Sequence, residues 1–420
     1  MKKSIIAFVA VCCLHLPVVY GQLTVEVCQQ KAQANYPEIK QLGLIPQSTA
    51  FTLSNANKGY LPQFSLSAKA TYQSDVTKIP ISIPNIHIQS LSKDQYQTTA
   101  AMSQLIWDGG AIHARKGEIR ASSNVDQQKV KVDLYDLNDR VNQLFFGILS
   151  LNEQLRQNKA LENELQTEYN KIEAYLRNGV ANQADVDNIH VELLNAGQQR
   201  ITLQTVRNSY VAMLSAMIGT TVNPEEITMP SLPDSITGTL VNKRPELSLF
   251  SAENQLYDSQ RKNIYADNLP KINFFVQGGY GRPGLNMLDN SFKPYYIGGI
   301  QLSWNFGNLY TLKNNLRTID LNQKIVASQR ETFLFNSRLT EMQQSNQITQ
   351  WQKLIRNDDE IIRLRNAVKL AADAKVANGT LSVTDLITDI TAENQARIDK
   401  ALHQVQLLLS IYNLKYTTNN

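Results

Sequence analysis

Cysteine is almost absent from this chain of 420 residues, which contains three. Cys12 and Cys13 lie in an N-terminal stretch that we expect to be removed, so Cys28 alone remains in the mature protein. A single thiol cannot form an internal disulfide, and it cannot supply the several thiolates of a structural zinc site. The chain must therefore be held together by ordinary packing or by contacts with other chains.

An excess of charge of either sign is also missing. Lys and Arg total 41 and Asp and Glu total 37, which gives a formal net charge of +4. This value falls to about +2 once Lys2 and Lys3 leave with the N-terminal stretch. The charges are dispersed among many Gln, Asn, Ser and Thr residues and form no basic stripe, a pattern that argues against nucleic acid as a partner.

The sequence also lacks the motifs that carry enzyme or metal chemistry. Apart from His15 near the N-terminus, the histidines stand far apart in the sequence, at His87, His113, His190 and His403. There is no Gly-x-Ser-x-Gly elbow, and the glycine-rich segment 278–284 lacks the Gly-Lys-Ser/Thr ending of a phosphate loop. We therefore predict no catalytic residue, cofactor or metal, and we interpret 278–284 as a strand end and loop.

The N-terminal segment 1–21 has the pattern of a secretory signal peptide, with two lysines, a short apolar stretch and a compact residue at Gly21. We expect cleavage after Gly21. Val11 before Cys12 is not the small residue that lipid attachment needs, so lipidation is not expected. No apolar run after Gly21 approaches 18 residues, so the sequence predicts no membrane-spanning helix.

Four segments alternate instead at the period of a β-strand: 63–72, 96–107, 271–280 and 295–306. In the first, Phe64, Leu66 and Tyr72 fall on one face and Ser65 and Lys69 on the other. Each segment has roughly the ten residues that a tilted membrane strand requires. The alternation predicts strands with one apolar and one polar face.

Long helical patterns separate the strand pairs. From Gly110 to Arg177 there is no proline, and apolar residues recur with heptad spacing at Leu134, Leu137, Val141, Leu144, Ile148, Leu151 and Leu155. At 1.5 Å per residue such a helix is roughly 100 Å long. A second helix over 185–218 completes a hairpin at 110–218. The pattern recurs over 309–416, with apolar residues at Leu354, Ile361, Leu364, Val368 and Ala371.

The two halves of the chain repeat one plan of helix, strand, strand, long helix, tight turn and long helix. The sequence Arg-Asn-Gly-Val around Gly179 corresponds to Ala-Asn-Gly-Thr around Gly379. We predict a first repeat at 22–220 and a second at 244–420. The proline-rich segment 221–243 is the predicted linker.

Four strands cannot form a stable membrane structure on their own. Open strand edges in a bilayer leave unpaired backbone amides that cost several kcal/mol each, so the strands must belong to a closed barrel. Bacterial barrels begin at about eight strands, so the smallest closed assemblies are a dimer with eight and a trimer with twelve. The sequence thus predicts an obligate oligomer, mainly α-helical, with a small membrane β part.

The order of these features resembles the TolC-like outer membrane efflux proteins over nearly all of the mature chain. The residues that carry the resemblance are Tyr36-Pro37 and Arg244-Pro245-Glu246-Leu247 near the start of each half, Leu61-Pro62-Gln63 and Leu269-Pro270-Lys271 before a strand, Trp107-Asp108-Gly109-Gly110 after one, and Asn-Gly followed by Asp185 or Asp385. The resemblance implies a trimer with a twelve-stranded outer membrane barrel that continues into a long periplasmic barrel of helices. It also implies a passive exit duct that works with a periplasmic adaptor and an inner membrane transporter.

Asp185 and Asp385 follow the two glycine turns, and two interpretations stay open. A short carboxylate at a helix N-cap accepts the free amides of the first turn. The resemblance implies instead that acidic residues near the tip surround the channel entrance, favour cations and help to hold it shut, with Asp389 as a further candidate. Where relatives with a well-known gate carry Tyr, Arg and a second Asp, this chain has Val376, Leu381 and Thr388. That particular gating network is not expected here.

The turn residues Gly179, Val180, Gly379 and Thr380 also have two interpretations. Glycine supplies the positive φ that a tight turn needs, which by itself accounts for both glycines. The resemblance implies that the same residues are the place where the tip of a periplasmic adaptor docks.

A protein of another class could share these patterns. A periplasmic coiled-coil scaffold or adaptor would have the same long helical hairpins, and soluble β-hairpins could mimic the strand alternation. Such a protein would never enter the bilayer. An enzyme is the third possibility, and no motif in the sequence supports it.

Overall fold

The computed structural model describes residues 23–77, 90–232 and 241–419, so the predicted signal peptide lies outside the described residues. In chain order the elements are α1 (Val25–Asn35), η1 (Pro37–Lys40), α2 (Gln41–Asn57), η2 (Lys58–Tyr60), β1 (Gln63–Tyr72), β2 (Asp94–Trp107), α3 (Ala111–Arg177), α4 (Gln183–Ile218), η3 (Pro224–Glu226), α5 (Pro245–Asp267), β3 (Lys271–Arg282), β4 (Lys293–Ser303), α6 (Asn308–Ala377) and α7 (Val383–Thr418). Within the described part of the chain, no helix combines the length and the apolar character that a membrane span requires.

The chain divides into two compact units, and each unit takes segments from both halves of the sequence. Unit 1 comprises Met1–Tyr36, Leu137–Thr239 and Gln343–Tyr416, and unit 2 comprises Pro37–Asp136, Leu240–Met342 and Thr417–Asn420. The predicted repeats therefore describe the order of elements along the chain, whereas the compact units group corresponding parts of both repeats.

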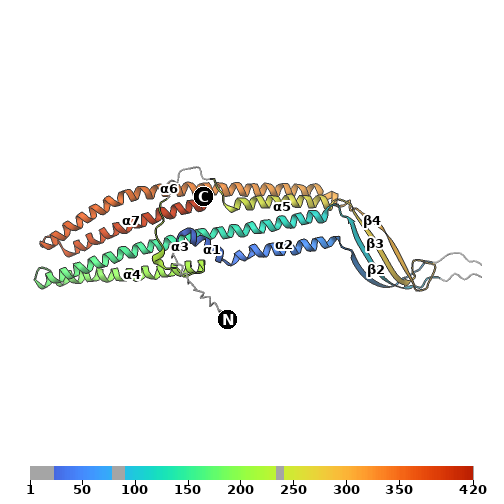
Figure 1. Cartoon of the computed structure of the whole chain (residues 1–420), viewed down its shortest axis with the longest axis horizontal. Coiled ribbons are helices and arrows are strands. Elements are labelled where there is room, and N and C mark those ends of the chain that lie inside the picture. The colour runs from blue at the N-terminus through green and yellow to red at the C-terminus, as the bar shows by residue number, and fades with distance from the viewer. Residues whose placement is uncertain (1–22, 78–89, 233–240, 420) are drawn as a thin grey trace, which may run out of the picture. The chain divides into compact units, whose positions relative to one another are not determined.

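Unit 1 is made of helical hairpins. Figure 1 shows α4 running back beside α3 and α7 running back beside α6, with each pair joined at a short turn. The predicted heptad stripe of α3 is buried at Leu134, Leu137, Val141, Leu144, Ile148 and Leu151. One core of unit 1 forms where this stripe meets α1, α4 and α7, with Phe145, Phe146, Leu214 and Leu408 at its centre.

Cys28 belongs to this core and is fully buried on α1. Burial raises the pKa of its thiol to about 11, because a thiolate loses its hydration there. The thiol therefore packs as a small apolar side chain.

The predicted apolar stripe of α6 is much more exposed to solvent than that of α3. Ile361 is 46% exposed, Leu364 is 49% exposed and Val368 is 48% exposed. The buried apolar residues on this part of α6 are instead Ala372 and Val376, which face the other helices of unit 1. The predicted stripe of α6 is therefore helical but only about half covered within the described chain.

Unit 2 contains one antiparallel sheet with strands in the order β1-β2-β3-β4. The register places Phe64 opposite Met102 and Met102 opposite Val276, so the apolar residues of neighbouring strands share one face. The opposite face carries mainly Ser, Thr, Gln and Asn, together with three lysines and the aromatic residues Phe275 and Tyr295. β1 and β4 each pair with one neighbour only, and both are open edges of the sheet among the described residues.

The strands differ slightly from their predicted bounds. β2 begins two residues early at Asp94 and β3 extends to Arg282, which makes the first five residues of the glycine-rich segment 278–284 part of a strand, as predicted. β4 ends at Ser303 and not at Phe306. The indole nitrogen of Trp304 donates to the Asn268 carbonyl at 3.0 Å, and the Asn305 side chain accepts from the Gly307 amide at 3.0 Å. These bonds turn the chain out of the sheet and into α6.

The motif Trp107-Asp108-Gly109-Gly110 is the corresponding turn from β2 into α3. The buried Asp108 carboxylate accepts from the Gly110 amide at 2.9 Å and from the Ile112 amide at 2.7 Å, which caps the helix. Both glycines have positive φ, and a Cβ at Gly109 would come within 2.5 Å of the Cβ of Leu269. The motif is therefore explained by the geometry of this turn.

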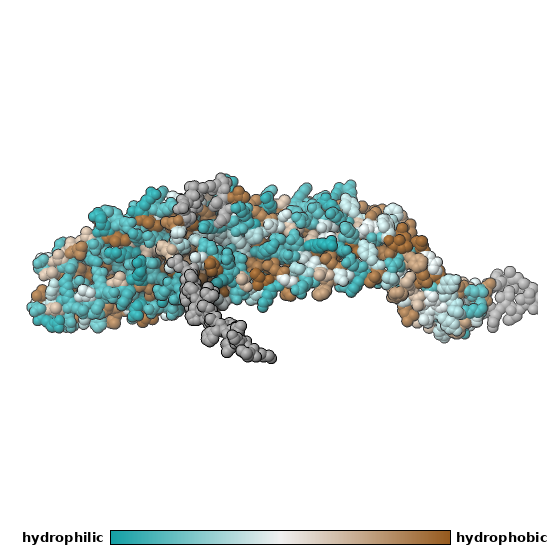
Figure 2. Space-filling view, in the orientation of Figure 1, coloured by the Kyte–Doolittle hydropathy of each residue, from teal (hydrophilic) through white to brown (hydrophobic). Residues whose placement is uncertain are grey.

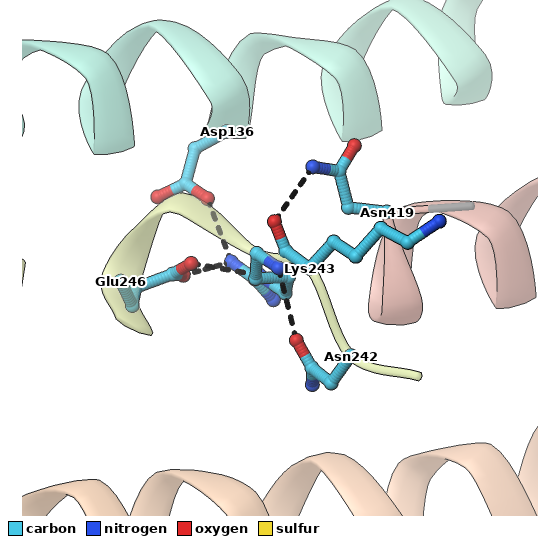
Figure 3. A network of polar contacts seen from close by, with 6 residues as sticks. Asp136, Asn242, Lys243, Glu246 and Asn419 are labelled. Carbon is cyan, nitrogen blue, oxygen red and sulfur yellow. Dashed lines mark hydrogen bonds and ion pairs between the residues drawn. The ribbon is translucent and has the colours of Figure 1, made fainter. Parts of the chain in front are cut away.

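The motif around Arg244 fixes the start of α5. Arg244 pairs with Glu246 and lies 3.2 Å from Asp136 on α3, and Figure 3 shows both carboxylates of this network. The guanidinium also sits 5.4 Å from the ring centroids of Tyr135 and Phe333. Backbone bonds add to this network, because the Lys243 carbonyl accepts from the Asn419 side chain at 2.9 Å. One arginine thus connects α3, α5 and α6 in unit 2.

Substitution R244A should destabilise unit 2 by about 2 kcal/mol, because it leaves the half-buried Glu246 carboxylate without its charged partner. The midpoint of chemical denaturation, followed by circular dichroism, measures this loss. The control is R363A, since the ion pair of Arg363 among the described residues is with Glu360 on the exposed surface of α6, and its loss should not move the midpoint. Equal effects of the two substitutions would contradict the role given to Arg244.

Candidate functional site at the hairpin tips

The two hairpins of unit 1 end in turns with the same backbone geometry. In the first, the Val180 amide donates to the Tyr175 carbonyl at 2.9 Å and the Gly179 amide donates to the Leu176 carbonyl at 3.1 Å. In the second, Thr380 and Gly379 donate in the same way to Lys375 and Val376, both at 2.9 Å. These paired bonds form a Schellman motif, in which the residue after the helix takes the left-handed conformation. Gly179 has φ 72° and Gly379 has φ 68°.

The four predicted tip residues are accessible to a partner. Gly179, Val180, Gly379 and Thr380 are all exposed, and Val180 is 60% exposed. No other atom would lie within 4 Å of a Cβ added at either glycine. The Thr380 hydroxyl bonds back to the Lys375 carbonyl at 3.1 Å, which leaves its methyl group on the surface. Docking at these residues stays a prediction, because the backbone geometry alone accounts for the glycines.

The N-cap prediction for Asp185 and Asp385 is wrong by three residues. The N-cap of α4 is Asn182, whose side chain accepts from the Asp185 amide at 3.0 Å. Asp185 completes a capping box, because its carboxylate accepts in return from the Asn182 amide at 3.1 Å. Ser382 has the corresponding role before α7, with its hydroxyl accepting from the Asp385 amide at 3.1 Å and donating to the Asp385 carboxylate at 2.7 Å. Asn182 and Ser382 stand three positions before Asp185 and Asp385, which is the spacing of a capping box, so the sequence does contain the signal for the correct N-cap residues.

Asp389 lies one helical turn after Asp385 on α7 and is half-buried. It forms no ion pair with any of the described residues, so the structure does not bring it into a polar network within the chain. Its proposed place at a channel entrance stays a prediction.

An apolar cluster joins the two hairpins near their tips. It contains Leu165 and Ile172 of α3, Val186 and Ile189 of α4, Ala372 and Val376 of α6, and Val383, Leu386 and Ile390 of α7, with Leu381 packed against it. Val376 and Leu381 occupy two positions where gated relatives were expected to carry polar side chains. In this chain these positions contribute to hydrophobic packing.

A different set of ion pairs crosses between the hairpins. We call Glu164, Lys171, Lys369, Asp373 and Glu393 the inter-hairpin ion network. Lys171 of α3 pairs with Asp373 of α6, and Lys369 of α6 lies 2.6 Å from Glu164 of α3 and 3.5 Å from Glu393 of α7. Sequence reasoning missed these residues because the members of each crossing pair lie about 200 positions apart.

The inter-hairpin ion network lies partly out of solvent. The Glu393 side chain is 2% exposed and also pairs with Arg397. Burial raises the pKa of the neighbouring Glu168, an effect that the charge of Lys171 only partly offsets. Burial alone would lower the pKa of Lys171, but its hydrogen bond to Asp373 and the charge of Glu168 outweigh this and raise it. Lys171 therefore stays charged throughout the physiological pH range.

Comparisons with known proteins identify a related family and solved structures with a similar fold. Residues 29–220 match the family of outer membrane efflux proteins. No curated protein matches the sequence. Among solved structures, CusC, described in terms of transmembrane channel formation, superimposes with a TM-score of 0.68 at 14% identity, covering 94% of this chain and 91% of that one. The fold is that of the TolC-like outer membrane channels.

Two further structures show the same TolC-like fold. The outer membrane protein VceC from Vibrio cholerae has a TM-score of 0.64 at 12% identity, with 94% of each chain covered. The outer membrane channel CmeC from Campylobacter jejuni has a TM-score of 0.66 at 12% identity, with 94% of this chain and 85% of that one covered. The predicted mainly α-helical TolC-like fold with a small sheet is confirmed over nearly the whole chain, and residues 29–220 carry the sequence pattern of the efflux family.

Replacing a tip glycine should loosen its turn. Alanine in the left-handed conformation costs about 1 kcal/mol, so G379A should speed hydrogen exchange of amides in the second tip by about fivefold. The control is G197A, since Gly197 lies within α4 with open space at its Cβ position, and alanine there should be neutral or stabilising. Unchanged exchange at the tip of G379A, measured by mass spectrometry, would contradict the role of the Schellman motif.

Proposed function

We propose that this chain is the outer membrane channel of a tripartite efflux or type I secretion system. In this proposal three copies form a passive exit duct, and an inner membrane transporter supplies the energy through a periplasmic adaptor. The observation that carries the proposal is the four-stranded sheet of unit 2, which has one exposed apolar face and two open edges.

The apolar face of the sheet fits a lipid environment. Phe64 is 78% exposed, Tyr296 is 81% exposed and Ile300 is 71% exposed, and all three lie on the same face by the strand register. Figure 2 shows hydrophobic surface at the end of the strands that adjoins the helices, with paler surface toward their far end. Contiguous apolar surface of this kind is rare on soluble monomers and matches the outward-facing belt of an outer membrane barrel.

The open edges of β1 and β4 require further strands. A strand edge in hydrocarbon has no water to satisfy its amides and carbonyls, so it must pair with another strand. Pairing β1 of one copy with β4 of the next closes a barrel without any new element. Three copies supply twelve strands, the number that the resemblance implies.

The helices also have surfaces that fit neighbouring copies. Ile361, Leu364 and Val368 of α6 form an exposed apolar stripe, and Val191, Leu194 and Ile201 of α4 are between 52% and 60% exposed. A stripe at helical spacing needs a partner helix to exclude water. In the proposed trimer the hairpins of adjacent copies cover these stripes and form a continuous wall of helices in the periplasm.

The tips have two roles in this proposal. The exposed turn residues Gly179, Val180, Gly379 and Thr380 receive the adaptor. Asp185, Asp385 and Asp389 lie beside the entrance, and the inter-hairpin ion network holds the two hairpins of each copy together in the closed state. Adaptor binding favours the separated arrangement and so opens the entrance.

Extraction from membranes distinguishes this proposal from a periplasmic scaffold. A channel should stay in the membrane fraction through salt and carbonate washes and should need detergent for release. A scaffold should leave with carbonate. Release of the native protein without detergent would contradict the proposal.

The gating role can be tested on the purified trimer in a planar bilayer. Replacing Lys171 and Lys369 by Met removes both ammonium groups that bridge the hairpins, so the open population should rise roughly tenfold, the equivalent of about 1.4 kcal/mol. The measurement is the fraction of time that single channels spend open, recorded without adaptor.

The matched control for this double variant is R156M, because within the described part of the chain Arg156 forms its ion pair with Glu153 on its own helix. Its conductance should equal that of the native protein. If the double variant forms stable trimers and conducts no more than the native protein, the inter-hairpin ion network does not hold the entrance closed.

A further inference from the structure

The polar face of the sheet carries charge of one sign. The four strands contain a single carboxylate, Asp94, and the register places it opposite Tyr72 on the apolar face, where it pairs with Arg282. The polar face contains Lys69, Lys271 and Lys293 and no acidic residue. Within the described strands, this face is therefore purely basic.

Of these three lysines, Lys69 is the one best placed to act on a solute. Lys293 pairs with Asp289 of the loop before β4, so its charge is partly neutralised. Lys271 is the first residue of β3, at the helical end of the sheet, and is half-buried. Lys69 lies within β1, is exposed, faces the neutral Gln97 across the strand pair, and forms no ion pair with a described residue.

The bulky side chains of the polar face leave this lysine unobstructed. The Tyr295 hydroxyl lies 3.2 Å from the Thr99 hydroxyl and accepts a hydrogen bond from Gln97, and a Cβ at Gly279 would overlap the tyrosine ring. The ring thus lies flat across β3 and β2. Phe275 covers Gly299 in the same way, with its ring 3.3 Å from the position of a Cβ there. Both aromatic rings lie along the sheet and do not project from it.

The strand register also places two of the lysines, Lys69 and Lys293, in the same cross-strand row. Lys69 is opposite Gln97, Gln97 is opposite Gly281, and Gly281 is opposite Lys293, so the two lysines occupy one cross-strand row at the two edges of the sheet. Edge-to-edge association repeats this row around the assembly, and symmetry gives every copy the same contribution.

We infer that the strand-lined part of the duct favours anionic solutes over cationic ones, with Lys69 as the main determinant. The inference rests on the proposed function, because only closure of the sheet makes its polar face the wall of a water-filled passage. The unpaired Lys69 ammonium groups, on a wall whose strands carry no carboxylate on this face, raise the local concentration of anions and repel cations.

The reversal potential of the purified full-length protein in a planar bilayer, measured across a potassium chloride gradient, tests this inference. K69Q should lower the chloride-to-potassium permeability ratio, and K69E should lower it further, by at least about twofold relative to the native protein. S67K adds a second ammonium two residues away on the same face and should raise the ratio. The charge-conserving control K69R should leave it unchanged.

The outcomes separate this inference from the function on which it rests. If neither the native protein nor the variant lacking Lys171 and Lys369 conducts, the channel itself is contradicted. If the native protein conducts and K69E forms trimers with the native reversal potential, the channel stands and the role of Lys69 is wrong. Because Lys69 is exposed, its replacement should not impair folding, and the yield of detergent-extracted trimer verifies this.

Discussion

Unpaired backbone groups at two strand edges govern the structure of this protein. The sheet of unit 2 has four strands, and β1 and β4 each lack a neighbour on one side. In water such edges would be solvated, but the exposed apolar face that carries Phe64 and Ile300 is suited to hydrocarbon, where no solvent can satisfy an amide. These two features are compatible only if the edges pair with other copies. Oligomerisation is then a condition for the strands to be stable in the membrane.

The helical part also has surfaces that the single chain does not cover fully. α3 buries its heptad stripe within unit 1, whereas α6 leaves Ile361, Leu364 and Val368 near half exposure. Both helices have similar length and periodicity, so the difference lies in which partners the single chain provides. The inter-hairpin ion network and the apolar cluster join the hairpins within one copy. In the proposed assembly the uncovered stripes would be covered by helices of adjacent copies, and the tips would separate without unfolding of the helices.

Much of this organisation could be predicted from the sequence, because alternation and heptad spacing are local properties. β1 has its predicted bounds, and the tip glycines adopt the expected positive φ. The prediction from sequence was wrong where two neighbouring residues could each be the N-cap. Asp185 was predicted, but the N-cap is Asn182, three positions earlier. Prediction from sequence also failed where partners lie far apart. Helix surfaces carry many lysines and glutamates, and only the packing of α3 against α6 selects Lys369 and Glu164 as a pair.

The most direct test of obligatory closure is disulfide crosslinking between the two sheet edges. A cysteine at Ser67 of β1 is combined in turn with a cysteine at successive positions of β4, while buried Cys28 is left in place as an unreactive thiol. The account predicts that one register gives crosslinks between chains, with a covalent ladder on a denaturing gel that ends at three chains. Crosslinks confined to single chains, or none at any register in membrane-extracted protein, would contradict it.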